Sequence, residues 1–150
     1  SIALISAGAR NDPTLKGVIV EAPHVFVEDI SVSSIARIRE LYDSTDMAEK
    51  LARHHGANIE CAFRGWNDVW LEAAFLDWNI EEYLAGIRVP LLVIQGADDE
   101  YGTPAQVQAI AEQAGAPVEV NLLADCGHSP HRDQTKKTLS AMTRFIAQRG

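Results

Sequence analysis

The sequence has few cysteines, few basic residues and no long hydrophobic run, and each shortage excludes a class of protein. Its 150 residues include only two cysteines, too few for a disulfide framework. A reducing compartment, the cytoplasm, is therefore expected. No run of about 18 apolar residues predicts a membrane-spanning helix. No basic segment precedes an apolar one in the way that marks a secretory signal.

Basic residues are outnumbered by acidic ones, 13 to 21, which gives a net charge of -8. Nucleic acids and anionic membrane surfaces both recruit basic faces, so neither partner is expected. The acidic excess favours solubility instead. The hydrophobic content of 47% and the length are typical of one domain with a packed core.

Three short apolar runs are typical of strands in a parallel sheet. Residues 90–95 are mostly branched and apolar, which suits a strand that is buried on both faces. Two more short runs that contain branched apolar residues cover residues 18–22 and 118–123. We expect the three strands to lie side by side in chain order.

Helical patterns alternate with these strands. A helix of small apolar residues is expected over 2–9 and ends at Asn11-Asp12-Pro13. Another, over 104–114, connects the last two strands. The final helix, over 133–148, has an apolar stripe of Leu139, Met142, Phe145 and Ile146. Together these patterns predict the α/β fold class.

A long helical insertion, residues 30–86, separates the first two strands. Helical segments are expected from about residue 30, with Ser31 or Ser33 as the cap, and then over 45–55, 66–77 and 80–86. The insertion contains the aromatic residues Trp66, Trp70, Phe75 and Trp78. These side chains either pack as core or line an apolar substrate pocket, because ligand sites are mostly apolar and aromatic.

Acidic and histidine side chains follow two successive strands. Asp98 and Asp99 lie in the loop just after Gly96, and His128 lies in the loop after residues 118–123. The carboxyl ends of parallel strands meet at one edge of a sheet, so these groups are expected to lie close together. A histidine oriented by an aspartate is the base that activates a hydroxyl nucleophile.

The two motifs, Pro-Leu-Leu-Val-Ile-Gln-Gly-Ala-Asp-Asp and Gly-His-Ser-Pro-His, resemble the C-terminal part of an α/β-hydrolase. The resemblance covers nearly the whole chain. It implies a parallel three-strand remnant of an α/β-hydrolase sheet, built from residues 1–29 and 87–150, with residues 30–86 as a helical cap. In that family the triad order is nucleophile, acid, histidine. The third residue after the strand-ending glycine, Asp99, matches the acid, with Asp98 as the alternative, and His128 matches the base.

One part of the family pattern is missing: no Gly-x-Ser-x-Gly occurs in the sequence. The resemblance implies that this nucleophile motif belongs to a segment before Ser1, and that residues 2–7 form the helix that leaves it. Cys126 stands two residues before His128, but its context favours a structural loop residue over a nucleophile.

Other histidines carry weaker expectations. His24 follows the first strand and is a candidate for lining the substrate site. The spacing of His128, His131 and Asp133 matches no metal motif, so neither a metal nor a cofactor is expected.

Two functions from different classes follow. The first is an esterase-like or lactonase-like acyl hydrolase that acts on a small apolar substrate, with these 150 residues inactive by themselves. The second is a catalytically inactive fragment that serves as a binding or interaction module, because a fold alone does not decide function. An unpaired edge on the strand at 18–22 is expected to recruit the missing N-terminal half or a second copy of the chain.

Overall fold

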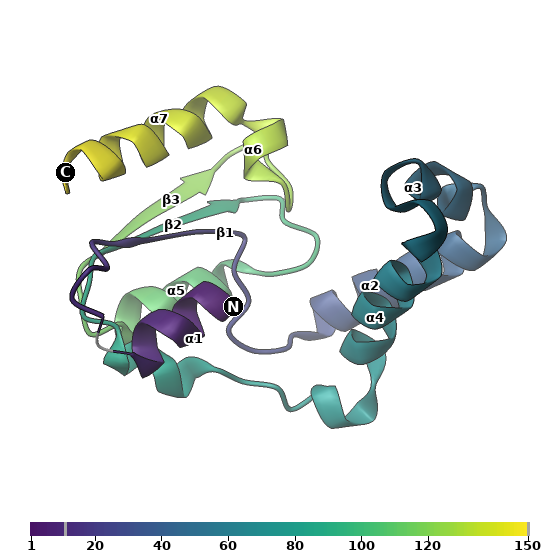
Figure 1. Ribbon diagram of the computed structural model, residues 1–150, viewed down its shortest axis with the longest axis horizontal. Coiled ribbons are helices and arrows are strands. Elements are labelled where there is room, and N and C mark those ends of the chain that lie inside the picture. Colours follow the sequence, from purple (N-terminus) through teal and green to yellow (C-terminus); the bar gives the residue numbers. More distant parts are fainter. Residues whose placement is uncertain (11, 150) are drawn as a thin grey trace. The chain divides into compact units, whose positions relative to one another are not determined.

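The computed structural model describes residues 1–10 and 12–149. The helix end predicted around Asn11 therefore falls partly outside the described residues. The chain forms two compact units, Ser1–Phe26 with Asn79–Gly150 and Val27–Trp78. The first unit holds the sheet and the second is helical (Figure 1).

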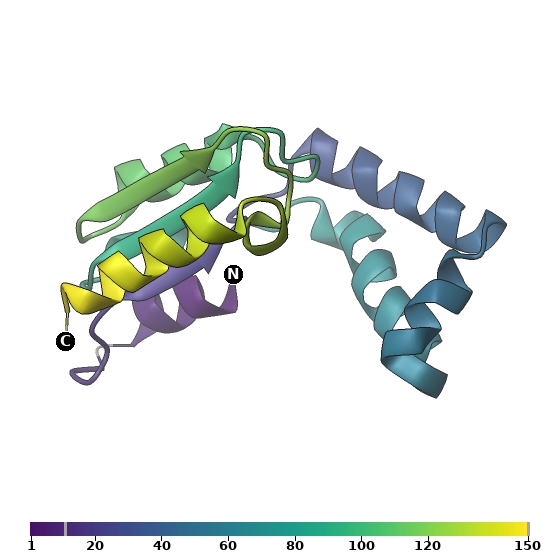
Figure 2. The same ribbon diagram turned by 90° about the horizontal axis from the view of Figure 1, so that it is seen from above.

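The sheet has three parallel strands, β1 (Val18–Glu21), β2 (Leu91–Gly96) and β3 (Val118–Leu123), in the order β1-β2-β3. Val93 of β2 aligns with Val20 on one side and Val120 on the other. Figure 2 shows β2 in the middle, where every one of its residues is buried. The predicted strands, their parallel pairing and their order are confirmed.

Helices cover both faces of the sheet (Figure 1). On one face lie α1 (Ile2–Ala9) and α5 (Pro104–Gln113), and on the other lie α6 (Pro130–Asp133) and α7 (Thr135–Ala147). The hydroxyl of Thr103 accepts a hydrogen bond from Ala105 N–H and caps α5, whose first residue is a proline. The result is the α/β layering that the sequence predicted.

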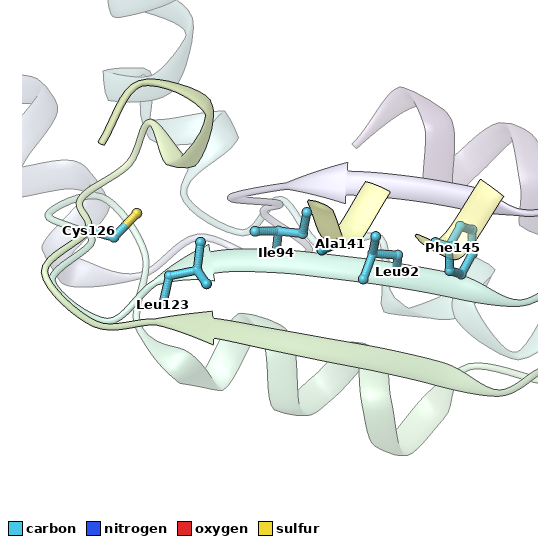
Figure 3. Packing of buried hydrophobic residues seen from close by; sticks show 6 residues of the cluster. All are labelled: Leu92, Ile94, Leu123, Cys126, Ala141 and Phe145. Carbon is cyan, nitrogen blue, oxygen red and sulfur yellow. The ribbon is translucent and has the colours of Figure 1, made fainter. Parts of the chain in front are cut away.

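The face under α7 encloses one apolar cluster (Figure 3), formed by Leu92, Ile94, Leu123, Cys126, Ala141 and Phe145. The predicted stripe of α7 is wrong at two positions, because Leu139 is 56% and Ile146 61% exposed. The buried side instead runs through Thr138, Ala141 and Phe145. Thr138 is accommodated there because its hydroxyl donates to Pro130 O at 2.9 Å.

The helical unit contains α2 (Asp29–Ser44), α3 (Met47–His55) and α4 (Ile59–Leu71), with short 3-10 turns at Gly56–Asn58 and Ala73–Phe75. The helix predicted over 66–77 thus starts earlier and ends earlier, because the turn at Gly56–Asn58 leads straight into α4. Ser31 and Ser33 do not cap α2: the helix already begins at Asp29, after the extended residue Glu28.

Polar and aromatic contacts join α2 to α4. The buried Asn67 side chain donates to Ile35 O at 2.9 Å and accepts from Arg39 Nε at 2.7 Å, so both of its ends are satisfied. Tyr42 and Phe63 stack with ring centroids 3.7 Å apart. These contacts fix the two longest helices of the unit against each other.

Residues 80–86 were predicted to belong to the cap, but they pack in the sheet unit. The 3-10 helix η3 (Glu81–Gly86) lies against α1, and a Cβ on Gly86 would stand only 2.2 Å from Gly8 O. Ile80 N–H donates to Val25 O at 2.8 Å and attaches the segment beyond β1. The helical unit therefore ends at Trp78, and it begins at Val27.

Within the described residues, the structure contains no helix with the length and apolar character needed to cross a membrane.

Candidate active site

The loop after β2 fixes the Asp99 carboxylate at the carboxyl edge of the sheet. Only 1% of this side chain is exposed. Its Oδ1 accepts hydrogen bonds from Tyr101 N–H at 2.9 Å and Gly102 N–H at 3.3 Å. Gln95, on β2, donates to Gly102 O at 2.7 Å and holds the far side of the same loop. Backbone donors of its own loop therefore help to orient Asp99.

The loop after β3 lies directly against the end of β2. Asp98 N–H donates to Cys126 O at 2.9 Å, and Ala97 N–H donates to Leu123 O at 2.8 Å. This approach requires Gly96, because a Cβ there would stand 2.0 Å from Cys126 O. The strand-ending glycine thus brings the acid loop and the histidine loop together.

His128 meets Asp99 at this junction. Its Nδ1 lies 2.9 Å from Oδ1 and 3.0 Å from Oδ2 of the carboxylate. The predicted approach of these two side chains is confirmed. Asp98, the alternative, instead accepts a hydrogen bond from Cys126 N–H at 3.4 Å.

The electrostatics of the pair fix the tautomer of His128. Burial alone would raise the pKa of Asp99, but hydrogen bonds from His128, Tyr101 N–H and Gly102 N–H outweigh it and hold that pKa below its ordinary value. Asp99 is then an ionised acceptor, so Nδ1 of His128 must carry the hydrogen that it donates. The neutral ring keeps a lone pair on Nε2, the nitrogen that can accept a proton.

Two rings flank the imidazole of His128. The ring of Tyr101 lies 4.9 Å from it and that of His24 lies 5.7 Å from it, centroid to centroid. Burial, together with the charges of Glu100 and Asp99, raises the pKa of Tyr101, so its phenol stays protonated. His24 is thus near the predicted base, while its role in binding substrate stays a prediction.

The thiol of Cys126 is poorly suited to act as a nucleophile. The residue is buried in the apolar cluster under α7. Burial and then the carboxylates of Asp133, Asp99 and Asp98 raise the pKa of the thiol, which disfavours the reactive thiolate. This agrees with the structural role expected from the sequence.

The histidines do not gather into a metal site within the described residues, where no group of three or more metal-binding side chains lies close together. His131 instead pairs with Glu21, at 3.0 Å between Nδ1 and Oε2. Asp133 accepts a hydrogen bond from Gly127 N–H at 2.9 Å.

The predicted aromatic substrate residues all belong to the helical unit. Trp70, Phe75 and Trp78 form one cluster, with ring centroids 5.2 to 6.0 Å apart. Trp66 packs edge-on against Phe63 and is 38% exposed. It also lines an apolar groove of about 340 Å³ between α2, α3 and α4. Contact of these side chains with a substrate stays a prediction.

Sequence reasoning missed several polar residues that hold the site. Gln106 is fully buried and accepts a hydrogen bond from Val25 N–H at 2.7 Å, which anchors the segment after His24. Gln95 supports the acid loop, and Glu21 binds His131. The available signal was a polar residue within an otherwise apolar strand, as at Gln95 and Glu21.

The architecture of this chain recurs in many solved structures. NosK from Streptomyces actuosus matches 99% of the chain with a TM-score of 0.72 at 18% sequence identity. A meta-cleavage product hydrolase from Pseudomonas fluorescens matches 99% with a TM-score of 0.70 at 12% identity. An alpha/beta fold family hydrolase from Bacillus anthracis matches 95% with a TM-score of 0.68 at 15% identity. The chain has the α/β-hydrolase fold.

The α/β-hydrolase resemblance of the motifs is thereby confirmed at the level of fold. The chain covers 64%, 61% and 62% of those three proteins, respectively. It therefore spans less than two thirds of the solved chains that it resembles, as expected for the C-terminal part of the fold. No family model matches the sequence, and a search of curated proteins finds no match.

Proposed function

We propose that this chain supplies the acid and histidine of an α/β-hydrolase that cleaves an ester, a lactone or a related acyl substrate. The observation that carries the proposal is the Asp99–His128 pair. Its carboxylate is buried, it lies beyond the carboxyl ends of β2 and β3, and both of its oxygens are within 3.0 Å of Nδ1.

The pair has the chemistry of a general base. Nε2 of His128 takes the proton of a hydroxyl as its oxygen attacks the acyl carbon, and the ring becomes an imidazolium. The ionised Asp99 stabilises that cation through the hydrogen bond from Nδ1. His128 then returns the proton to the leaving oxygen, and water repeats the sequence to release the acid.

The nucleophile of this reaction comes from polypeptide outside these 150 residues. The sequence contains no Gly-x-Ser-x-Gly, and the solved relatives extend well beyond the region that the chain matches. A serine on a sharp strand-to-helix turn is the nucleophile that this fold uses. The oxyanion-hole donors belong with it.

A second proposal concerns the partner of β1. Within the described residues β1 pairs only with β2, so its other edge offers unpaired N–H and C=O groups. Beside it lies a groove of about 300 Å³ lined by residues of α1, of β1 and of the segment just before β1, including Ala3, Leu15 and Ile19. Ile2 is 85% exposed nearby on α1. We propose that the missing N-terminal half covers this edge, or that a second copy of the chain does so.

The substrate proposed here is small and apolar. The helical unit supports the apolar choice only through its own composition: Ile38, Leu51, Ile59 and Trp66 line an apolar groove within it, and ligand sites are mostly apolar and aromatic. Cleavage of p-nitrophenyl esters with acyl chains of increasing length measures that preference. A rate that rises with chain length supports an apolar acyl pocket, and a preference for acetate contradicts it.

The proposed function is tested by comparing two forms of the protein. The 150-residue chain should not hydrolyse p-nitrophenyl esters above background, whereas a longer form that includes the preceding reading frame should. His128→Ala should abolish the activity of the longer form. Hydrolysis by the 150-residue chain that His128→Ala abolishes would refute the external nucleophile. An inactive longer form would favour the binding-module alternative.

The partner proposal needs a separate measurement. Light scattering on the purified 150-residue chain should report self-association at micromolar concentration, and addition of the N-terminal half should replace it with a heterodimer. A clean monomer with a cooperative melt would contradict the proposal.

A further inference from the structure

A second carboxylate–imidazole pair lies at the same edge of the sheet. Glu21 is the last residue of β1, and its Oε2 accepts two hydrogen bonds from His131. One comes from the backbone N–H at 3.1 Å and the other from ring Nδ1 at 3.0 Å. A single carboxylate oxygen thus holds both the main chain and the side chain of His131.

The position of Glu21 follows from the alternation of β1. Side chains two apart on a strand face the same side of the sheet, so Glu21 shares a side with Ile19. Ile19 packs against the apolar cluster under α7. Glu21 therefore points toward the layer of α6 and α7, where His131 is the second residue of α6.

The strand order makes this contact a long-range one. The loop that carries His128 leaves β3, and β2 separates β3 from β1. To reach Glu21, the chain between Leu123 and His131 must cross the end of β2. His128 lies within that crossing, three residues before His131. The crossing is therefore attached at both of its ends, to β3 and to β1.

Carboxylates also hold the backbone of the crossing near its middle. Cys126 N–H donates to Asp98 at 3.4 Å, Gly127 N–H to Asp133 at 2.9 Å and His128 N–H to Glu100 at 3.3 Å. Asp98 and Glu100 belong to the acid loop after β2, and Asp133 belongs to α6. The bond between His131 and Glu21 differs because it alone, among these four, reaches β1.

We propose that Glu21 and His131 form a positioning pair, which fixes the His128 loop to the end of β1 and so keeps Nδ1 of His128 on Asp99. The expected effect on kcat rests on the proposed function, whereas the expected effect on the position of the His128 ring does not. The pair does not touch the reacting atoms, and its effect on catalysis passes through His128.

The substitutions below test the hydrogen bond that the His131 side chain donates to Glu21. One of them is conservative and keeps a donor at the same place. His131→Asn keeps an N–H donor attached to the γ carbon, as Nδ1 is in histidine. His131→Leu removes the donor while keeping comparable bulk. Glu21→Leu removes the acceptor from the other side. Arg132→Ala, which changes the next, exposed side chain, is the matched control.

The first readout is exchange of the His128 Nδ1 hydrogen with water, measured by NMR. His131→Leu and Glu21→Leu should each speed this exchange by about tenfold or more, as the ring spends more time away from Asp99. His131→Asn should restore most of the protection, and Arg132→Ala should leave it unchanged. The double variant should exchange no faster than Glu21→Leu alone, because that change already removes both hydrogen bonds from His131.

The second readout is hydrolysis by the longer, active form. A misplacement of about 1 Å can cost about 100-fold in rate, so we expect kcat to fall about tenfold in the two leucine variants, with KM nearly unchanged. His131→Asn should recover kcat. An inactive wild-type protein would contradict the proposed function. The exchange measurement would still test whether Glu21 and His131 position His128.

Unchanged exchange and unchanged kcat in both leucine variants would overturn the inference. A loss that His131→Asn fails to rescue would also overturn it, since the N–H donor would then not be what positions the loop. A rescue confined to His131→Asn, with Arg132→Ala at wild-type values, is the result expected here.

Discussion

Among the described residues, two carboxylate–histidine pairs have nearly the same distance between Nδ1 and a carboxylate oxygen but different surroundings. Asp99 meets His128 at 2.9 Å, and Glu21 meets His131 at 3.0 Å. The Asp99 side chain is 1% exposed and that of Glu21 is 25% exposed. The imidazoles are 35% and 58% exposed. The distance between partners therefore does not distinguish the pairs, but burial does.

Because the two pairs are buried to different extents, their carboxylates differ in how strongly they can stabilise a charged imidazole. Asp99 accepts two further hydrogen bonds from its own loop, so its charge is held in place by backbone donors. Such a group can stabilise an imidazolium that forms during reaction. Glu21 lies where water competes for its charge, and exposed ion pairs contribute little energy. We expect Glu21 to matter instead because it attaches the His128 loop to the end of β1.

The largest expected difference between the pairs is in catalysis. In the longer form that is proposed to be active, Asp99→Asn should lower kcat by about 10⁴-fold, as removal of the orienting carboxylate does in serine proteases. Glu21→Leu should lower it only about tenfold. Steady-state hydrolysis of a p-nitrophenyl ester measures both. Equal losses of kcat in the two variants would contradict the expectation that the more buried pair matters more for catalysis.

A change at Gly96 should disturb both pairs together. In Gly96→Ala the new Cβ would meet Cys126 O and push the His128 loop from the end of β2. Overpacking of this kind typically costs about 1–3 kcal/mol of stability, and both histidines should lose their partners.

The matched control for this change is Gly65→Ala, in α4. A Cβ there meets nothing within 4 Å, and alanine favours a helix over glycine. Urea unfolding should therefore show Gly65→Ala to be neutral or stabilising. Equal stability of the Gly96→Ala variant and the wild type would show that the close approach is not required.

The smallest expected effect is on the pH dependence of stability. The pKa of Asp99 is lower in the folded protein than its ordinary value of 3.8. Its ionised form therefore stabilises the fold at pH values above the unfolded pKa, and that contribution is lost as the pH falls through the folded pKa.

The asparagine variant isolates this contribution. The stability difference between wild type and Asp99→Asn should be greatest near neutral pH and should shrink below about pH 4. Urea unfolding of both proteins across that range measures it, and the other carboxylates cancel because they are common to both. A difference that stays constant with pH would contradict a lowered pKa for Asp99.

Much of the sheet and the first pair could be predicted from the sequence. Branched apolar runs mark buried parallel strands clearly, and their carboxyl ends must share one edge. Asp99 and His128 each lie in the loop that follows such a run. Their meeting depended only on strand order, which short connections largely determine.

The second pair could not be predicted, because it joins residues that are 110 positions apart across an intervening strand. The face of α7 was also misjudged, since hydrophobicity favoured Leu139 and Ile146 while the buried positions include Thr138. A hydroxyl can be buried in a core when it donates to a backbone carbonyl, as Thr138 does. The periodicity of the sequence does not show where such a carbonyl will lie. The boundary at residue 79 was missed for a similar reason, because the contact between Gly8 and Gly86 is tertiary.

The role of His128 as a base is tested most directly by nitrogen NMR, which shows which ring nitrogen of the neutral imidazole carries the hydrogen. We expect a hydrogen on Nδ1 and none on Nε2, because the ionised Asp99 accepts only from Nδ1. Asp99→Asn should abolish this preference, and Glu21→Leu should only weaken it. A hydrogen found on Nε2 in the wild-type protein would contradict the account, since that nitrogen could not then accept a proton from a nucleophile.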